Sequence, residues 1–262
     1  MQPLTMNLCN LPPWVIAAPE FNANPKPIEI QGVRRAHRFL FERLATMPDP
    51  QARAKAFLDH MDVAFQLHQW EQETSALGRK SLKNSYLRFL RGWMFDANSL
   101  EGAVLKGWVE SRIGIPPTFH KEAVGDVHSA TYAAYLADRM RGSARTSAIQ
   151  AQFDLLYEFV QEELRRREEP PVCILFRGIH DFSEHRVLDK GERHRMRLRL
   201  NNLNSFTPDF ERAFEFGTKV LEVQVPSCKV FFRADLLPGA LLKGEEEVMV
   251  IGGDFDVIVR TG

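Results

Sequence analysis

One stretch divides the chain into two parts: Pro170-Pro171-Val172-Cys173-Ile174-Leu175-Phe176-Arg177-Gly178. Before the proline pair, apolar residues recur with the period of a helix. Prolines disfavour helical conformation at their own position and at the preceding one, so the pair ends the last helix. The apolar run that follows, residues 172–176, is typical of a strand buried on both faces. The sequence therefore predicts a helical front half and a β-rich rear half.

The front half carries helix boundary signals around apolar stripes. Asp49-Pro50 is a start signal, because proline is tolerated at the first helical position, and Ser99 is another candidate cap. The last helix places six apolar residues on one stripe: Ile149, Phe153, Leu156, Tyr157, Val160 and Leu164. Its end, Arg165-Arg166-Arg167, suits the negative end of the helix dipole. We predict a helical region over residues 35–169, preceded by an extended, proline-rich arm over residues 1–34.

The rear half alternates short strand candidates with turns. The candidates are apolar or alternating runs at residues 172–176, 198–200, 221–225, 230–232, 248–251 and 255–259. One helix is credible among them, with Thr207-Pro208 as its cap and first residue. Many strands with one helix do not form a doubly wound βαβ pattern. We predict an α+β fold, in which the helical part packs against a compact β-rich core at residues 170–262.

The composition excludes several function classes. The 262 residues include 34 basic and 34 acidic side chains, so the formal charge gives no reason to expect nucleic acid or an acidic membrane as partner. Cys9, Cys173 and Cys228 lack metal-ligand spacing and are too few for a disulfide framework. No signal peptide is recognisable, and apolar runs fall short of the ~18 residues that span a bilayer. We expect a cytoplasmic protein with no metal site.

The first of three short motifs is Phe176-Arg177-Gly178. An arginine directly after a buried strand presents a fixed pair of donors, which suits a diphosphate. The glycine allows a ligand to approach the backbone. An arginine at this position also commonly pairs with a carboxylate, and the motif alone does not distinguish the two interpretations.

The other motifs are Ser205-Phe206-Thr207 and Glu245-Glu246-Glu247. Residues two apart in an extended segment share a face, so Glu245 and Glu247 lie on one side, roughly 6–7 Å apart, with Glu246 turned outward. Ser205 can bond a carboxylate or a ribose, whereas Thr207 before Pro208 is also a good helix cap. The acidic run by itself is typical of a solvated turn.

In this order, the motifs resemble the arginine–serine–glutamate class of mono-ADP-ribosyltransferases, including Ala213 and Phe216 after the serine motif. The front half resembles the dinitrogenase reductase ADP-ribosyltransferase family. Two stretches carry that resemblance: Asn98-Ser99-Leu100-Glu101-Gly102-Ala103-Val104-Leu105-Lys106-Gly107-Trp108 and Pro116-Pro117-Thr118-Phe119-His120. The chain departs from the class where Ser-Phe-Thr replaces the commoner Ser-Thr-Ser, which leaves the role of Thr207 open. Few residues follow Glu247, so we expect the last part of the sheet to be short.

The resemblance implies an activity and a site. NAD is the implied co-substrate, an arginine of dinitrogenase reductase the acceptor, and a nitrogen-regulatory PII signalling protein the controlling partner. Glu247 is expected to stabilise an oxocarbenium-like transition state. Ser205 is expected to orient that carboxylate, and Glu245 to engage the acceptor guanidinium. The implied NAD-binding residues are Arg177, Gly178, His180, Ser205, Phe206 and Thr207, although a lone histidine such as His180 is more often a surface residue.

Two other functions fit part of the sequence pattern. A paired-carboxylate glycosidase uses similar chemistry but commonly has aromatic sugar platforms, and the rear half contains neither tryptophan nor tyrosine. A degenerate core that binds NAD without turnover is the non-enzymatic alternative.

In the resembled class, residues 233–244 correspond to the loop that recognises the target. Its four leucines, Leu236, Leu237, Leu241 and Leu242, either dock a protein or belong to the core.

Overall fold

The computed structural model describes residues 7–67, 85–144, 146, 148–237 and 246–261. The helices are α1 (Pro13–Ala17), α2 (Pro19–Ala23), α3 (Val33–Ala36), α4 (Arg38–Ala45), α5 (Pro50–Phe65), α7 (Tyr86–Phe95), α8 (Leu100–Arg112), α9 (Ala130–Ser143), α10 (Ile149–Arg166) and α11 (Phe210–Phe214). The strands are β1 (Phe119–His120), β2 (Glu122–Ala123), β3 (Val172–Ile179), β4 (Arg186–Lys190), β5 (Arg195–Phe206), β6 (Lys219–Pro226), β7 (Val230–Arg233) and β8 (Val248–Thr261). The N-terminal half of the chain is mainly helical and the C-terminal half mainly β-strand, which confirms the predicted α+β fold.

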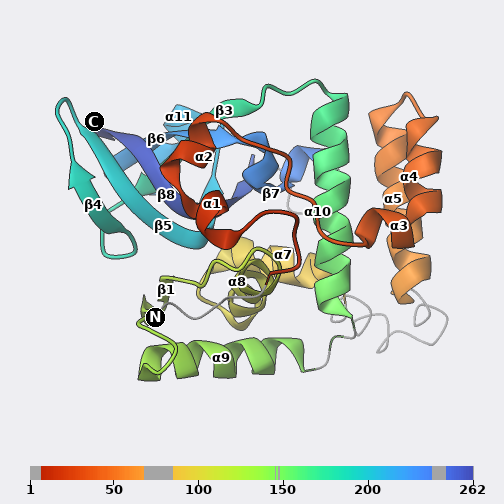
Figure 1. Ribbon diagram of the computed structural model, residues 1–262, viewed down its shortest axis with the longest axis horizontal. Helices are drawn as coiled ribbons and strands as arrows, with labels where there is room; N and C mark the ends of the chain where they lie inside the picture. Colours follow the sequence, from red (N-terminus) through yellow and green to blue (C-terminus); the bar gives the residue numbers. More distant parts are fainter. Residues whose placement is uncertain (1–6, 68–84, 145, 147, 238–245, 262) are drawn as a thin grey trace.

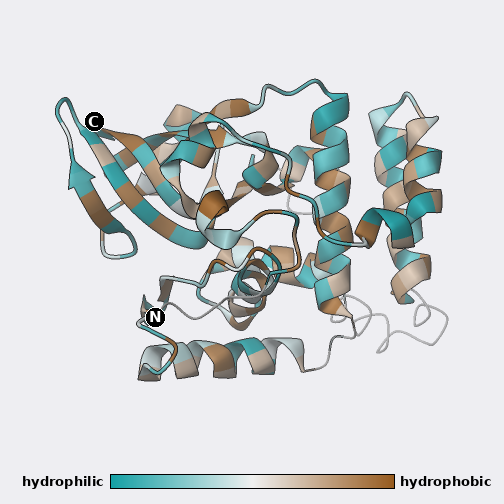
Figure 2. Cartoon of the chain, in the orientation of Figure 1, coloured by the Kyte–Doolittle hydropathy of each residue, from teal (hydrophilic) through white to brown (hydrophobic). Residues whose placement is uncertain are grey.

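The strands of the rear half form one antiparallel sheet (Figure 1). Within the described residues its order is β3-β6-β8-β5-β4, and β7 also pairs with β8. The central strand β8 thus contacts β5 on one side, and β6 and β7 on the other. Hydrophobic and hydrophilic residues alternate along the strands (Figure 2), as expected for a sheet with a covered face and an open one.

The length and position of β8 contradict the sequence prediction. Residues 248–251 and 255–259 belong to one strand, and the segment after Glu247 forms the centre of the sheet instead of a short end. The strand continues because a glycine, Gly252, lies opposite the irregular part of β5 and lets the two backbones approach closely. A Cβ on Gly252 would lie 1.7 Å from the Asn201 carbonyl oxygen.

The first strand, β3, also differs from the prediction. It lies at the edge of the sheet, where Leu175 and Ile179 are buried but Ile174 is 52% exposed. The expectation of a strand buried on both faces is therefore wrong, because an edge strand leaves part of its surface open. Arg177 lies within β3, opposite Leu221 of β6, and not after its end.

The predicted helix boundaries of the front half are confirmed at both start signals. Asp49 accepts hydrogen bonds from backbone N–H groups in the first turn of α5, and Pro50 is the first residue of that helix. Ser99 accepts one from the Gly102 N–H at the start of α8. The whole predicted apolar stripe of α10 is buried. Neither α9 nor β4 was predicted.

The N-terminal segment is not extended over its whole length. Residues 13–23 form α1 and α2, with Pro13 and Pro19 as their first residues. Prolines that suggested an extended arm thus begin helices, where their missing N–H costs nothing. The Asn22 amide donates to the Asp254 carbonyl at 2.9 Å and ties α2 to β8. The division into arm, helical region and core stays a prediction.

A shared core joins the two halves. In Figure 1, α10 stands between the sheet and the α4–α5 pair. Phe231 of β7 packs against Phe153 of α10 and Trp108 of α8, with ring centroids 5.9 and 4.8 Å apart. On the other side of α10, Phe159 stacks on Phe57 of α5 at 4.1 Å. The helical front is therefore part of the same packed unit as the sheet.

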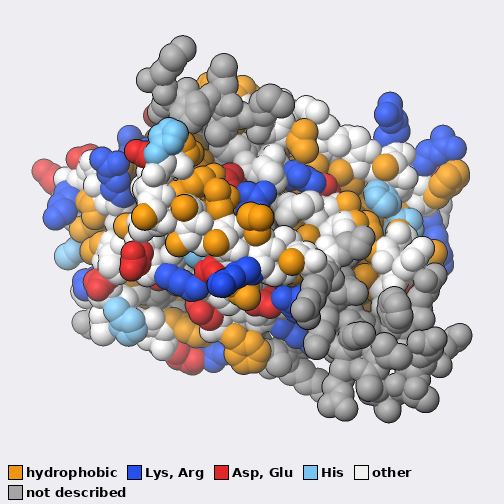
Figure 3. All heavy atoms as spheres, turned by 90° about the horizontal axis from the view of Figure 1, so that it is seen from below, with side chains coloured by type: hydrophobic (Ala, Val, Ile, Leu, Met, Phe, Trp, Pro, Cys, Tyr) orange, Lys and Arg blue, Asp and Glu red, His pale blue; other side chains and the backbone are white. Residues whose placement is uncertain are grey.

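The surface agrees with the neutral composition. On the face on which α9 lies, acidic and basic side chains are interspersed (Figure 3). Among the described residues, no helix has the length and apolar character needed to cross a membrane.

Candidate active site

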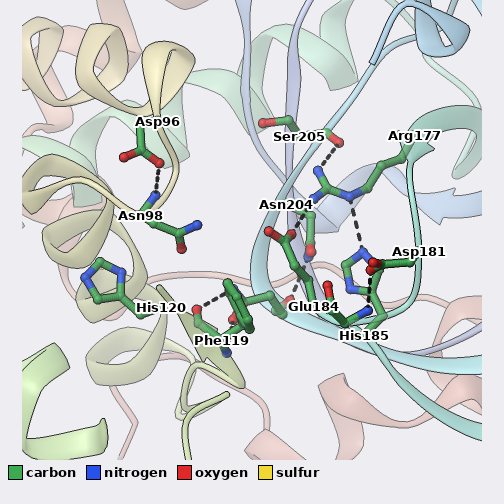
Figure 4. A network of polar contacts seen from close by, with 12 residues as sticks. Asp96, Asn98, Phe119, His120, Arg177, Asp181, Glu184, His185, Asn204 and Ser205 are labelled. Carbon is green, nitrogen blue, oxygen red and sulfur yellow. Dashed lines mark hydrogen bonds and ion pairs between the residues drawn. The ribbon is translucent and has the colours of Figure 1, made fainter. Parts of the chain in front are cut away.

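Three contacts fix the Arg177 side chain. Its Nη1 donates to the Ser205 carbonyl at 3.0 Å, its Nη2 lies 3.2 Å from the Glu184 carboxylate, and its Nε donates to His185 Nε2 at 3.4 Å (Figure 4). The side chain is 19% exposed. Burial lowers the pKa of Arg177, while Glu184 and Glu247 oppose that change. The guanidinium stays charged in any case, so the sheet presents a fixed cation beside the serine motif.

The serine and glutamate motifs meet because β5 and β8 are antiparallel neighbours. Phe206 pairs with Val248, and Ser205 with Met249, so Ser205 lies next to the residue that precedes β8. That residue is Glu247, and the Ser205 hydroxyl donates to its Oε1 at 2.5 Å. The hydroxyl and the carboxylate therefore form one polar unit.

A tryptophan from the front half completes this unit. The Trp93 indole Nε1–H points at both groups, 2.8 Å from Ser205 Oγ and 3.0 Å from Glu247 Oε1. Trp93 belongs to α7 and is 3% exposed. Apolar residues recur along α7 with helical spacing, but that spacing carries no signal for the Trp93 N–H.

These groups line one cavity of 310 Å³. Its wall combines the end of α7 and the following loop with β3, the end of β5, α11 and the start of β8. The lining residues are Trp93, Met94, Phe95, Asp96, Ala97, Phe176, Arg177, Gly178, Ser205, Phe206, Thr207, Arg212, Ala213, Phe216, Glu246 and Glu247. A fixed cation, a held carboxylate and exposed aromatic rings in one concave site suit a charged ligand that carries planar rings.

The two stretches that carry the family resemblance, residues 98–108 and 116–120, meet at the Lys106 side chain, whose Nζ lies 5.9 Å from the ring of the cavity residue Trp93. Its Nζ donates to the Asn98 side chain and the Phe119 carbonyl, both at 3.0 Å, and lies 3.5 Å from His120 Nδ1. The side chain is fully buried. Burial lowers its pKa to about 7, an effect that the neighbouring Glu184 and Asp96 charges oppose. Lys106 therefore holds the loop after α7 and the segment around β1 in one arrangement.

Comparison with known proteins identifies the family of this chain. Residues 6–259 match the family described as dinitrogenase reductase ADP-ribosyltransferase (DRAT). The chain belongs to the DRAT family. A curated relative from Rhodospirillum rubrum, named NAD(+)--dinitrogen-reductase ADP-D-ribosyltransferase, is 41% identical over 255 residues, which are 95% of this chain and 92% of that protein. No solved structure matches the chain.

In this DRAT-family site, two predicted residues have structural explanations that the sequence did not provide. Thr207 does not cap the following helix, because Asp209 caps α11 and the Thr207 hydroxyl accepts from the Asp209 N–H. An added Cβ on Gly178 would lie 2.0 Å from the Ala213 carbonyl oxygen. The close approach that requires glycine is thus made by α11. Both residues line the cavity, and their NAD-binding roles stay predictions.

The structure also bears on His180 and on the segment of residues 233–245. His180 is exposed and does not line the cavity, and its carbonyl accepts from Lys219 at 3.1 Å. Leu236 and Leu237 are buried, which favours the core interpretation for them. Glu245, Leu241 and Leu242 lie outside the described residues, so their predicted roles are untested.

His185 is a site residue that the sequence analysis missed. Burial, with a smaller effect of Arg177, lowers its pKa to about 3. The ring is therefore neutral near pH 7 and can accept the Arg177 Nε–H. We expect His185→Phe to raise the KM for NAD roughly threefold to tenfold with little change in kcat, since a bond to a charged group is lost. Steady-state NAD hydrolysis measures both constants.

The matched control for that prediction is His180→Ala. An unchanged KM in this variant, with a raised KM in His185→Phe, assigns NAD binding to the buried histidine. The opposite pattern contradicts the prediction and supports the NAD-binding role that the family resemblance implies for His180.

Proposed function

We propose that this chain transfers the ADP-ribose group of NAD to an arginine side chain of dinitrogenase reductase. One observation carries the proposal: in a chain of the DRAT family, Arg177 and the hydrogen-bonded pair Ser205–Glu247 line a single cavity. The protein is accordingly an NAD-dependent ADP-ribosyltransferase. The relative's name supports both the co-substrate and the protein acceptor.

The residues fit the NAD that this reaction needs. Arg177 uses only some of its N–H donors in the contacts to Ser205, Glu184 and His185, so others can bind a diphosphate. The exposed Phe216 ring, under the Arg212 guanidinium at 5.6 Å, provides a flat surface in the cavity that Glu247 also lines. We assign Arg177 to the diphosphate or the adjoining ribose.

The chemistry follows from the position of Glu247. In the reaction, the bond between nicotinamide and ribose C1′ breaks, its electron pair leaves with nicotinamide, and C1′ acquires oxocarbenium character. A carboxylate fixed beside that carbon stabilises the developing positive charge. An acceptor guanidinium nitrogen then bonds to C1′ and loses a proton. Guanidinium is too weakly acidic to lose that proton unaided, so a carboxylate must assist.

We assign this assistance to Glu245. With Glu245→Gln, we expect transfer to arginine to be lost and NAD hydrolysis to continue. Parallel assays of nicotinamide release and protein modification check this. Equal loss of both reactions contradicts the division of roles between Glu245 and Glu247.

The proposed function is tested by mass spectrometry of intact dinitrogenase reductase after incubation with NAD and this protein. The expected result is one added ADP-ribose group, located on an arginine by peptide fragmentation. NAD consumption without modification of dinitrogenase reductase would indicate another acceptor. If no NAD is consumed, even after a PII-type protein is added, the assignment of ADP-ribosyltransferase activity is overturned.

Two further assignments belong to this proposal. We propose a PII-type signalling protein as the regulatory partner, a role supported by the resemblance of the whole chain to the family. We also propose a cytoplasmic location, supported by three cysteines that are all free thiols.

A further inference from the structure

We infer that Trp93 is a positioning residue for Glu247, so that the helical front half supplies an essential part of the catalytic arrangement. The inference rests on the proposed function, because it takes Glu247 as the carboxylate beside the ribose. It extends the reaction machinery from the sheet to α7. The supporting observations are the direction of the hydrogen bonds, the support of the indole ring and the departure of the serine motif from its usual form.

The direction of the hydrogen bonds is fixed by chemistry. An indole N–H can only donate, whereas a serine hydroxyl both donates and accepts. Because Trp93 donates to Ser205 Oγ at 2.8 Å, the serine proton is directed to Glu247 Oε1 at 2.5 Å. Trp93 also donates directly to the same Oε1 at 3.0 Å. Both donors thus converge on one carboxylate oxygen and restrict the movement of the carboxylate.

The front half holds the helix that carries the indole, α7, and places one charged group near the ring. Phe89, one turn earlier on α7, packs edge-on against Phe153 of α10 with centroids 5.6 Å apart. The buried Lys106 ammonium lies 5.9 Å from the centroid of the Trp93 ring. Gly92 allows α8 to approach closely, since a Cβ there would lie 2.6 Å from Glu101 Cβ. The position of the N–H is therefore set by helix packing before any ligand binds.

The composition of the serine motif explains why Glu247 needs a hydrogen-bond donor from outside the sheet. The second position of the motif is Phe206, which is 3% exposed and packs in the core. Thr207 has its hydroxyl bonded to the Asp209 N–H. In the described part of the site, Trp93 is a second neutral donor that reaches Glu247 beside Ser205. A carboxylate preorganised by fixed donors needs no rearrangement in the transition state.

The test compares Trp93→Phe with Trp108→Phe. Both changes remove a buried indole N–H that donates to a carboxylate. Trp108 Nε1 donates to Asp154 at 2.7 Å, and neither of these residues lines the cavity. We expect Trp93→Phe to lower kcat for NAD hydrolysis and for transfer roughly 10- to 100-fold, because the reacting group loses its alignment. The KM for NAD should change less than about twofold. Trp108→Phe should keep kcat near the wild-type value.

A double-variant cycle with Ser205→Ala distinguishes positioning from structural damage. If both donors act through one carboxylate, the two losses in kcat are not additive, and the double variant is only slightly slower than the worse single variant. Site-specific replacement of Trp93 by benzothienylalanine, in which sulfur replaces the N–H, keeps the shape of the ring and should reproduce the loss.

The outcomes separate the two proposals. If the wild type is active and Trp93→Phe has the same kcat as Trp108→Phe, the inference is overturned and the proposed function is unaffected. Fully additive losses, or full activity with benzothienylalanine, overturn it as well. If the wild type neither hydrolyses NAD nor modifies dinitrogenase reductase, even with a PII-type protein present, the proposed function is wrong and the inference is overturned with it.

Discussion

Glu247→Gln lowers both NAD hydrolysis and ADP-ribose transfer roughly 10²- to 10³-fold, the range typical for loss of one preorganised electrostatic group. Glutamine keeps the shape and an oxygen that can accept from Ser205 and Trp93, but it carries no charge to stabilise the oxocarbenium-like state. The effect should fall on kcat, because the charge matters most in the transition state. Nicotinamide release and modification of dinitrogenase reductase, each measured over a range of NAD concentrations, check the result.

The matched control is Glu246→Gln, the same chemical change one residue earlier. Glu246 lines the cavity but is exposed, with its charge in contact with solvent. We expect a change of less than about threefold there, because an exposed charge is screened by water and salt. If Glu246→Gln costs as much as Glu247→Gln, the acidic run acts through its overall charge, and the assignment of a single carboxylate is wrong.

The contact between Ser205 and Glu247 shows how far the sequence alone could reach. Both residues occupy short motifs next to strands, and their order along the chain resembles that of a known class. That information was sufficient to predict that this serine and this carboxylate lie together, while their roles stay predictions. The same sequence placed Arg177 after a strand that in fact continues past it, because local propensity does not specify where an edge strand stops.

The contributions of Trp93 and His185 could not be predicted in this way. The apolar spacing along α7 is typical of a buried helix face that includes Trp93. Such spacing does not show which carboxylate an indole N–H reaches across 154 residues of chain. His185 lies before β4, a strand that the sequence analysis missed, so its proximity to Arg177 was also hidden. Such contacts arise from tertiary packing and are not encoded in spacing along one element.

Helix α10 shows a similar limit in the fold. Its apolar stripe was predicted correctly, yet its charged side also becomes buried. Glu158, Glu162 and Glu163 are nearly inaccessible, because α3 and α5 cover the face opposite the sheet. Arg34 pairs with Glu158 and Glu162, and Arg53 pairs with Glu163. Periodicity alone does not reveal that a second layer covers the polar side of the helix.

The pair Arg53–Glu163 is therefore expected to be critical for stability. Arg53 Nε and Nη2 bind the two oxygens of Glu163 at 2.7 and 2.8 Å, and Nη1 donates to the Pro48 carbonyl at 2.7 Å. Both side chains are at most 5% exposed. Arg53→Met leaves the Glu163 charge buried without its partner, a change that costs about 3–5 kcal/mol in the free energy of unfolding. Urea unfolding followed by circular dichroism measures the loss.

Two further variants isolate the cause of that loss. Lys55→Met removes a cation from the same helix, but the Lys55–Asp59 pair is 75% and 54% exposed, so we expect a cost below about 1 kcal/mol. The double variant Arg53→Met, Glu163→Met removes both buried charges and should recover most of the stability, since apolar side chains of similar volume can replace a buried pair. If the double variant is as unstable as Arg53→Met, the cost comes from lost packing and the freed Pro48 carbonyl, and the unpaired carboxylate is not its source.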